Sequence, residues 1–499
     1  MKKLLCSVFF SVFLFLNISA SEVVLDLERG KMLAKNGDYN RALEEFTRVI
    51  NSNPDNAEAF FNRALSYAGK GDYEKAILDY GRTLDINPYY DEAYYQRGNA
   101  YLKMGEYDNA LSDFNEAIRL NPGNDRAYNS RGLAYFETGD FDKAIEEYNK
   151  AIINNPNLVE AYENSGFAYT AKGDYKKAID DYTIALRINH ECQSIYTKRG
   201  FIHSALCEYA KAVGDFSEAV RLNPQDAEAH YNLANIFYML GDFDSAMGNY
   251  NKALWLDPVH DRAYNNRGNA FYRRGDHDKA LEDYNAAINI NPENDMAHTN
   301  RGLVFAGMID YDMAIEEYSE AIRINGKSEM IFNNRGNMYY HKGDYDKAIE
   351  DYNAAIQINP SYDRAYNNRG LAYNEKGEHD KAIENYDKAL GINPLYDTAY
   401  NNRGLAYESK GDLDKAIEDY NEAIKINPNN DTAYNNRALA YDGKGDYVRA
   451  LEDYNEAIKI NPGNQRAAQN RDDALRKNSE SINHAIPETE PGIPQDTEP

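Results

Sequence analysis

A proline that recurs at intervals of 34 residues is the feature that most constrains how this chain can fold. An asparagine usually precedes this proline, and every interval is 34 residues or twice 34. The series comprises Pro54, Pro88, Pro122, Pro156, Pro224, Pro258, Pro292, Pro360, Pro394, Pro428 and Pro462. His190 and Gly326 occupy the two skipped positions. Thirteen units of equal length therefore fit between Val23 and Asn464 without insertion or deletion.

Each unit has the pattern of two amphipathic helices, as the unit from Asp363 to Tyr396 illustrates. We predict that Asp363 caps the first helix, that Gly377 ends it and that Pro394 prevents the second helix from continuing. The apolar stripe of the second helix consists of Ala382, Ile383, Tyr386, Ala389, Leu390 and Ile392. Since neither helix can bury its stripe alone, the units must stack on one another as a solenoid.

The spacing of the aromatic and small residues resembles that of the tetratricopeptide repeat (TPR) family. The matching positions in one unit are Tyr366, Gly370, Tyr373, Ala382, Tyr386, Ala389 and Pro394. The resemblance implies an all-α, right-handed superhelical solenoid of thirteen 34-residue helix-turn-helix repeats. It also implies a concave groove, lined by the first helices, that binds extended peptide segments. Arginine replaces the family's usual leucine in eleven units, with Ser165 and Leu233 as the exceptions.

The repeat is irregular in two places. His190 replaces the proline between the fifth and sixth units, and Cys207 replaces the turn glycine of the sixth. In the ninth unit Ile309 replaces the turn glycine and Gly326 replaces the proline. Two interpretations are open, namely drift in a tolerant array, and a local bend or partner site.

The two ends of the chain differ from the repeats. Residues 1–20 combine a basic start, a short apolar run and small residues, which is typical of a cleaved signal peptide. No later stretch is apolar for long enough to span a membrane, so we predict an exported bacterial protein, periplasmic or secreted, without a span in the mature chain. Residues 465–477 are predicted as a polar capping helix, and residues 478–499 as a disordered acidic tail containing proline.

Composition narrows the classes of partner. The net charge of −26 disfavours nucleic acid and anionic lipid, because both carry phosphate charge of the same sign. The chain holds 43 tyrosines and one tryptophan, and regular placement of the tyrosines favours a packing role. Cys192 and Cys207 fall near opposite ends of one predicted helix, roughly 20 Å apart, which is too far for a disulfide between them.

No motif for catalysis, cofactor binding or metal binding stands out. The chain lacks a phosphate-binding loop and a nucleophile elbow, and its nine histidines are not spaced as metal ligands. The acidic residues of the second helices recur in register, as expected for a solvated face. We therefore predict no enzyme activity, no cofactor and no metal.

Asparagines on the first helices are the best candidates for contact with another protein. One position holds asparagine in seven consecutive units, and we name these residues the asparagine ladder: Asn232, Asn266, Asn300, Asn334, Asn368, Asn402 and Asn436. A carboxamide donates and accepts hydrogen bonds, so a row of them can bind the backbone of an extended peptide. The alternative is structural, since asparagine also bonds local backbone or the adjacent repeat.

Two further sets of first-helix residues have alternative roles. The repeated arginine is predicted to rest on apolar surface and pair with an acidic residue of a second helix, or else to bind a ligand. The candidates for groove aromatics are Tyr231, Tyr238, Tyr272 and Tyr340, for which packing between repeats is the alternative. The predicted function is a non-enzymatic scaffold or adaptor that binds extended protein segments. The alternative is a self-assembling or spacer protein of the cell envelope.

Overall fold

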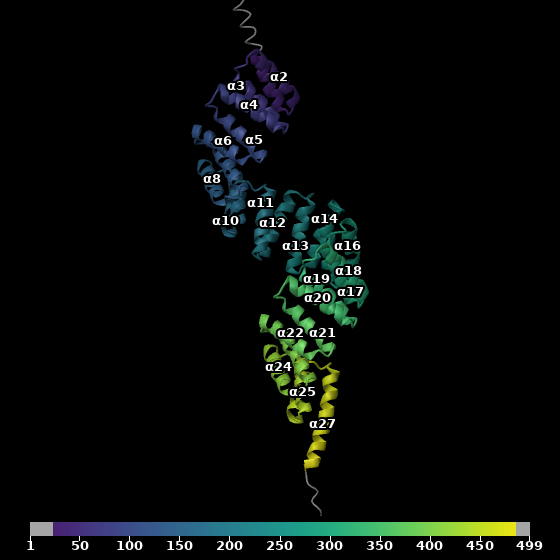
Figure 1. Ribbon diagram of the computed structural model, residues 1–499. Helices are drawn as coiled ribbons and strands as arrows, with labels where there is room; N and C mark the ends of the chain where they lie inside the picture. Colours follow the sequence, from purple (N-terminus) through teal and green to yellow (C-terminus); the bar gives the residue numbers. More distant parts are fainter. Residues whose placement is uncertain (1–22, 486–499) are drawn as a thin grey trace, which may run out of the picture. The chain divides into compact units, whose positions relative to one another are not determined.

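The computed structural model describes residues 23–485, and these residues form helices and turns without strands. The predicted signal peptide, residues 1–20, lies outside the described residues. The chain divides into two compact units, Met1–Ser245 and Ala246–Pro499. Helix α14, Phe243–Leu256, contains the division between them. Each unit is a stack of helices that follow one another in chain order (Figure 1).

The helices form the thirteen pairs that the repeat predicts. Residues 23–35 are the first helix of the first pair. The other first helices are α3 Ala57–Gly69, α5 Asp91–Lys103, α7 Asp125–Glu137, α9 Val159–Ala171, α11 Gln193–Ala205, α13 Ala227–Leu240, α15 Asp261–Arg273, α17 Asp295–Gly307, α19 Glu329–His341, α21 Asp363–Glu375, α23 Asp397–Ser409 and α25 Asp431–Gly443.

The second helices alternate with them along the chain. They are α2 Tyr39–Ser52, α4 Tyr73–Ile86, α6 Tyr107–Leu120, α8 Phe141–Asn154, α10 Tyr175–Ile188, α12 Tyr209–Leu222, α14, α16 His277–Ile290, α18 Tyr311–Ile324, α20 Tyr345–Ile358, α22 His379–Ile392, α24 Leu413–Ile426 and α26 Tyr447–Ile460. The prediction of an all-α solenoid of tandem repeats is confirmed. We number the repeats from Val23, so that Asp363–Tyr396 is repeat 11.

Small polar residues and glycine set the helix ends. In most repeats an aspartate before the second helix accepts a bond from the backbone three residues later, as Asp344 does from Lys347. The glycine before this aspartate adopts the left-handed conformation, with φ of 80° at Gly343. The predicted cap of the first helix is wrong, because Asp363 is the first helical residue and follows the N-cap Tyr362. Its carboxylate instead accepts a bond from Asn393, at the end of the same repeat.

The buried core has the same 34-residue period as the sequence. Each second helix buries an alanine and an aromatic residue, and in all but α2 and α4 a second alanine, as Ala382, Tyr386 and Ala389 show with no exposed surface. The alanines allow the paired helices to approach closely, and the aromatic ring fills the space between them. Burial raises the pKa of the hydroxyl in most of the buried second-helix tyrosines, to about 12 at Tyr182. This confirms that most of the regularly spaced tyrosines of the second helices serve packing.

The C-terminal helix is longer than predicted. Helix α27 spans Gln465–Ala485, so the boundary at residue 477 is eight residues too early, and the predicted tail begins inside this helix. Ala467 and Ala474 are fully buried, and Asn470 donates a hydrogen bond to Asn435 of repeat 13. The helix therefore covers the last repeat as a cap. Residues 486–499 of the predicted tail lie outside the described residues.

The irregular repeats keep the turn without its glycine. Cys207 has φ of 57° and Ile309 has φ of 63°, both in the region that glycine normally occupies. A side chain there crowds the backbone, most of all when it is β-branched. The repeat geometry around these turns thus imposes a conformation that the local residues disfavour. Both cysteines that the structure describes, Cys192 and Cys207, are free thiols.

Candidate protein-binding surfaces

The repeated arginine joins the two helices of its own repeat. In repeat 10 the Nε and Nη2 atoms of Arg335 donate to the two carboxylate oxygens of Asp351, at 2.9 and 2.7 Å. The same pairing, always across 16 residues, occurs in Arg63–Asp79, Arg97–Asp113, Arg131–Glu147, Arg199–Asp215, Arg267–Asp283, Arg301–Glu317, Arg403–Asp419 and Arg437–Asp453. In repeat 1, Arg29 and Glu45 lie 3.9 Å apart. The predicted pairing with an acidic residue is confirmed.

The same arginine also reaches the preceding repeat. The Nη1 atom of Arg335 donates to Ser319 Oγ at 3.0 Å, and that of Arg437 donates to Asn421 Oδ1 at 2.6 Å. In most repeats the guanidinium also lies over the ring of the aromatic residue one turn earlier, at 5.5 Å for Arg437 over Tyr434. Hydrogen bonding to Asp351 raises the pKa of Arg335. We name this arrangement the arginine staple, because one side chain connects its own helix to two others.

The asparagine ladder forms hydrogen bonds between consecutive repeats. Four of its members donate from Nδ2 to the asparagine that precedes the ladder position in the repeat before, each at 3.0 Å. These bonds are Asn300–Asn265, Asn368–Asn333, Asn402–Asn367 and Asn436–Asn401. Asn232, Asn402 and Asn436 are buried, and Asn266, Asn300, Asn334 and Asn368 are partly exposed. These are the contacts that the structural interpretation of the ladder requires.

The hydrogen bonds within the ladder show which of its atoms can still form a hydrogen bond with a peptide. Asn368 Nδ2 donates to both Asn333 and Asn337, so both of its N–H groups are used. Asn368 Oδ1 accepts one bond, from Asn367 at 3.1 Å, and a carbonyl oxygen has two lone pairs. Peptide binding by the ladder stays a prediction, and at Asn368 it is restricted to contacts in which the side chain accepts.

The four predicted groove tyrosines pack against the protein. Tyr231 is buried, with 8% of its surface exposed. Tyr238, Tyr272 and Tyr340 lie against the first residue of the following helix, with ring centroids 5.6 Å from Phe243, 5.3 Å from His277 and 5.5 Å from Tyr345. Burial raises the pKa of Tyr340. Ligand contact by these tyrosines also stays a prediction.

A recess that the sequence analysis missed lies between repeats 5 and 6. Its volume is about 300 Å³, and its lining comes from α9, α10 and α11: Phe167, Thr170, Tyr175, Tyr182, Lys198, Phe201, Ile202 and Ala205. Phe167 and Phe201 are about half exposed, at 46% and 51%. Phe136 of α7 extends the aromatic surface, with its ring centroid 5.0 Å from that of Phe167. We name this surface the phenylalanine recess.

A polar group stands beside the aromatic rings of the recess. Lys198 Nζ lies 5.5 Å from the centroid of the Phe167 ring and 2.6 Å from Glu163 Oε1. The recess therefore combines apolar lining with one positioned charge pair, as sites for peptide side chains do. The signal in the sequence was phenylalanine at the same first-helix position in two consecutive repeats, where repeats 2, 4, 9, 11, 12 and 13 have leucine.

The described residues hold no group of three histidine, cysteine or acidic side chains arranged to bind a metal ion. Nor does any described helix have the length and apolar character needed to cross a membrane.

Stacked helix pairs of constant length, joined by staples and a ladder, define a tandem-repeat solenoid. Family profiles described as "Tetratricopeptide repeat" match residues 27–91, 95–159, 159–191, 227–259, 398–430 and 432–464. Profiles described as "TPR repeat" match residues 208–241, 268–308, 336–377 and 370–411. These matches cover well over half of the chain, and the chain belongs to the tetratricopeptide repeat family. Proteins of this family are typically non-enzymatic scaffolds that mediate protein–protein interaction.

The chain is similar to several solved structures of TPR proteins. MamA is 30% identical, over 32% of this chain and 94% of its own, with a TM-score of 0.31. YrrB, described as a TPR protein with an unusual peptide-binding site, is 27% identical over 37% of this chain and 95% of its own, with a TM-score of 0.34. Yeast Tom70 is 16% identical over 94% of this chain and 98% of its own, with a TM-score of 0.40. A comparison with curated protein sequences found no match.

Proposed function

We propose that this protein is a non-enzymatic scaffold that holds extended segments of other proteins along its first helices. The observation that carries the proposal is the phenylalanine recess. Two half-exposed aromatic side chains from consecutive first helices border a cavity large enough for one apolar side chain. Burying such a side chain contributes about 2 kcal/mol, which suffices to anchor a peptide whose other contacts are weak.

The asparagine ladder has a defined part in this proposal. Both N–H groups of Asn368 are used between repeats, so this residue binds a peptide only by accepting from backbone N–H groups, whereas Asn402 donates one bond within the protein and keeps a second N–H group for a peptide carbonyl. Regular backbone contacts of this kind are independent of the peptide's side chains. The apolar recess then supplies the sequence preference.

A selection from a random peptide library tests the proposal on the full chain. We expect enrichment of peptides with an aromatic or large aliphatic residue, and at least tenfold weaker binding of these peptides by the double variant Phe167→Ala, Phe201→Ala. The matched control is the double variant Leu78→Ala, Ile153→Ala. It removes two apolar side chains of second helices that are more exposed than the two phenylalanines. Equal loss in both double variants, or no enrichment at all, would contradict the proposal.

Two further measurements address the rest of the proposed role. Light scattering at high protein concentration distinguishes a monomeric scaffold from the alternative of a self-assembling envelope protein, which requires larger particles. We also propose export, on the basis of residues 1–20. N-terminal sequencing of the protein isolated from its host is expected to begin close to residue 21, and an intact Met1 would contradict export by cleavage.

A further inference from the structure

Repeat 11 differs from every other repeat that has the arginine, because its arginine lacks a carboxylate partner. At the position of the acidic residue stands Asn385, which accepts from Arg369 Nε at 2.7 Å. The Nδ2 atom of Asn385 donates to the backbone oxygen of Lys381 at 2.7 Å, so its amide offers the guanidinium only one acceptor. Arg369 Nη1 donates to Asn353 in the preceding repeat. Within the described residues Nη2, which binds carboxylate in the other staples, has no acceptor.

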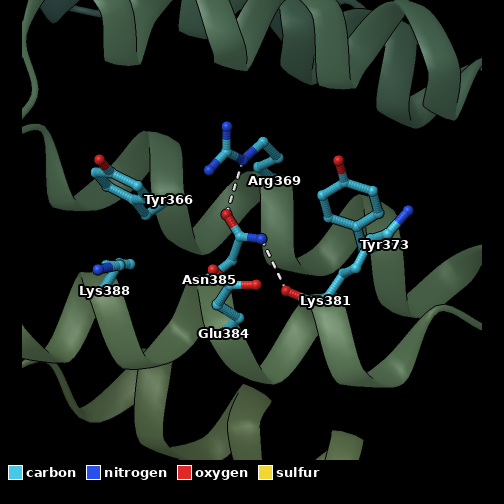
Figure 2. Close-up of a pocket in the computed structure, with 7 residues that line it drawn as sticks. All are labelled: Tyr366, Arg369, Tyr373, Lys381, Glu384, Asn385 and Lys388. Atoms are coloured by element: carbon cyan, nitrogen blue, oxygen red, sulfur yellow. Dashed lines mark hydrogen bonds between the residues drawn. The ribbon is translucent and has the colours of Figure 1, made fainter.

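An open recess of about 360 Å³ lies beside this guanidinium, between α21 and α22 (Figure 2). Its lining consists of Tyr366, Arg369, Tyr373, Lys381, Glu384, Asn385 and Lys388. Figure 2 shows Arg369 on one helix facing Asn385 and Glu384 on the other, with the two tyrosine rings on either side. We name this surface the repeat 11 recess.

The charge of this recess is opposite to that of its counterpart in the next repeat. Three cations, Arg369, Lys381 and Lys388, line it against one anion, Glu384. The equivalent positions of repeat 12 carry two cations against three anions, in Arg403, Lys415, Glu418, Asp419 and Glu422. The equivalent positions of repeat 2 also carry three cations and one anion, but there the anion is Asp79, which pairs with the staple arginine Arg63. The repeat 11 recess differs from its counterpart in repeat 12 at two charged positions, where Asn385 stands in place of Asp419 and Lys388 in place of Glu422.

The cations of the recess differ in how much of their charge is already neutralised. Lys381 pairs with Glu378 at 2.5 Å. Lys388 forms no ion pair with the described residues. Burial lowers the pKa of Arg369, whereas ion pairing raises that of Arg335 and Arg437. A half-buried guanidinium without a counter-charge is costly, and an incoming anion removes that cost.

We propose that the repeat 11 recess binds a carboxylate group from an acidic segment of a partner protein, between Arg369 Nη2 and Lys388. The other staples of this chain show the chemistry, since Nη2 binds a carboxylate oxygen at 2.6–2.9 Å in most of them. In repeat 11 the chain omits that oxygen and leaves a solvent-accessible space beside the donor. The site is separate from the phenylalanine recess, which belongs to the other compact unit. Failure of either proposal therefore leaves the other standing.

The test uses the full chain and N-acetyl-glutamate amide as the probe, observed by saturation-transfer NMR. Asn385→Asp supplies the missing carboxylate from within the chain and restores the staple that the neighbouring repeats contain, so it is expected to fold. It should weaken probe binding at least tenfold. The matched control Asn421→Asp makes the same charge change beside Arg437. It copies repeat 11, where the position equivalent to Asn421 is Asp387, which accepts from Arg403. It should leave probe binding within twofold of the unaltered chain.

Two further arms determine the source of the anion and the part played by the lysine. Lys388→Glu, which copies Glu422 of repeat 12, should also abolish binding, and N-acetyl-glutamine amide should not bind. Inorganic phosphate should compete only weakly. Binding that is equal in the unaltered chain and in Asn385→Asp, or absent from both, would overturn the site. Tight phosphate binding without carboxylate binding would overturn the assignment to an acidic protein segment.

Discussion

Removal of one carboxylate from an arginine staple is expected to destabilise the array locally, and repeat 10 is the place to test this. Arg335 and Asp351 form two hydrogen bonds, and their side chains are 20% and 7% exposed. Asp351→Ala leaves the guanidinium bonded only to Ser319, in a setting that water reaches poorly. An unpaired charge in such a position costs about 3 kcal/mol.

Two graded variants follow arrangements that the chain already contains. Asp351→Asn copies the Arg369–Asn385 pair, retains one acceptor and should cost about 1 kcal/mol. The double variant Arg335→Leu, Asp351→Asn copies repeat 7, where Leu233 stands at the arginine position. It should lie within about 1 kcal/mol of the unaltered chain, because no charge is left buried. The order of the three costs therefore separates loss of attraction from the cost of an unpaired charge.

Native-state hydrogen exchange is the appropriate assay, since a long repeat array does not unfold in one step. A cost of 3 kcal/mol corresponds to about a 100-fold faster exchange of protected amides in α19 and α20. Amides of α5 and α6, in the other compact unit, serve as the internal control and should not change. An increase below fivefold in Asp351→Ala, or an equal increase in Asp351→Ala and in the double variant, would refute the reasoning.

Three other predictions concern single repeats. Asp181 has no arginine, because Ser165 replaces it, and burial raises the pKa of this carboxyl. Since the folded state then holds the proton more tightly than the unfolded state, stability falls as pH rises from about 4 through the raised pKa. Asp181→Asn should remove this part of the pH dependence, as measured by urea midpoints between pH 4 and 7. Ile309→Gly and Cys207→Gly should each raise stability by about 1 kcal/mol in calorimetry, and a decrease would show that the turn does not store strain. Asn402→Ala should cost about 1 kcal/mol in hydrogen exchange of α21 and α23, while no effect would exclude a structural ladder.

Helix positions and core residues could be predicted from the sequence because they depend on local patterns that recur thirteen times. The alanines and tyrosines of the second helices, such as Ala382 and Tyr386, have one environment in every repeat. Predictions at the ends of elements were less accurate. The first helix of repeat 11 begins at Asp363 itself, one residue earlier than predicted, and the cap helix extends past residue 477 to Ala485. Helix ends depend on single hydrogen bonds, which the pattern does not resolve.

The candidate site could be predicted only in part. The sequence identified the first helices and their asparagines, but not that Asn402 donates to Asn367 of the preceding repeat. Such a bond depends on the rotation between neighbouring repeats, which no single repeat encodes. The phenylalanine recess was missed for the same reason, because Phe167 and Phe201 are 34 residues apart and meet at one cavity only after stacking.

The sequence by itself determined the repeat, the helix pairs and the buried small and aromatic residues, because a fixed period with a fixed apolar pattern permits only a stack of identical pairs. The tertiary structure decided which polar side chains are used inside the protein. From the sequence alone, a buried arginine, asparagine or aspartate cannot be distinguished from an exposed one. Only the packing shows that ten arginines have acidic partners while Arg369 has none, because that depends on distances between helices rather than on order along the chain.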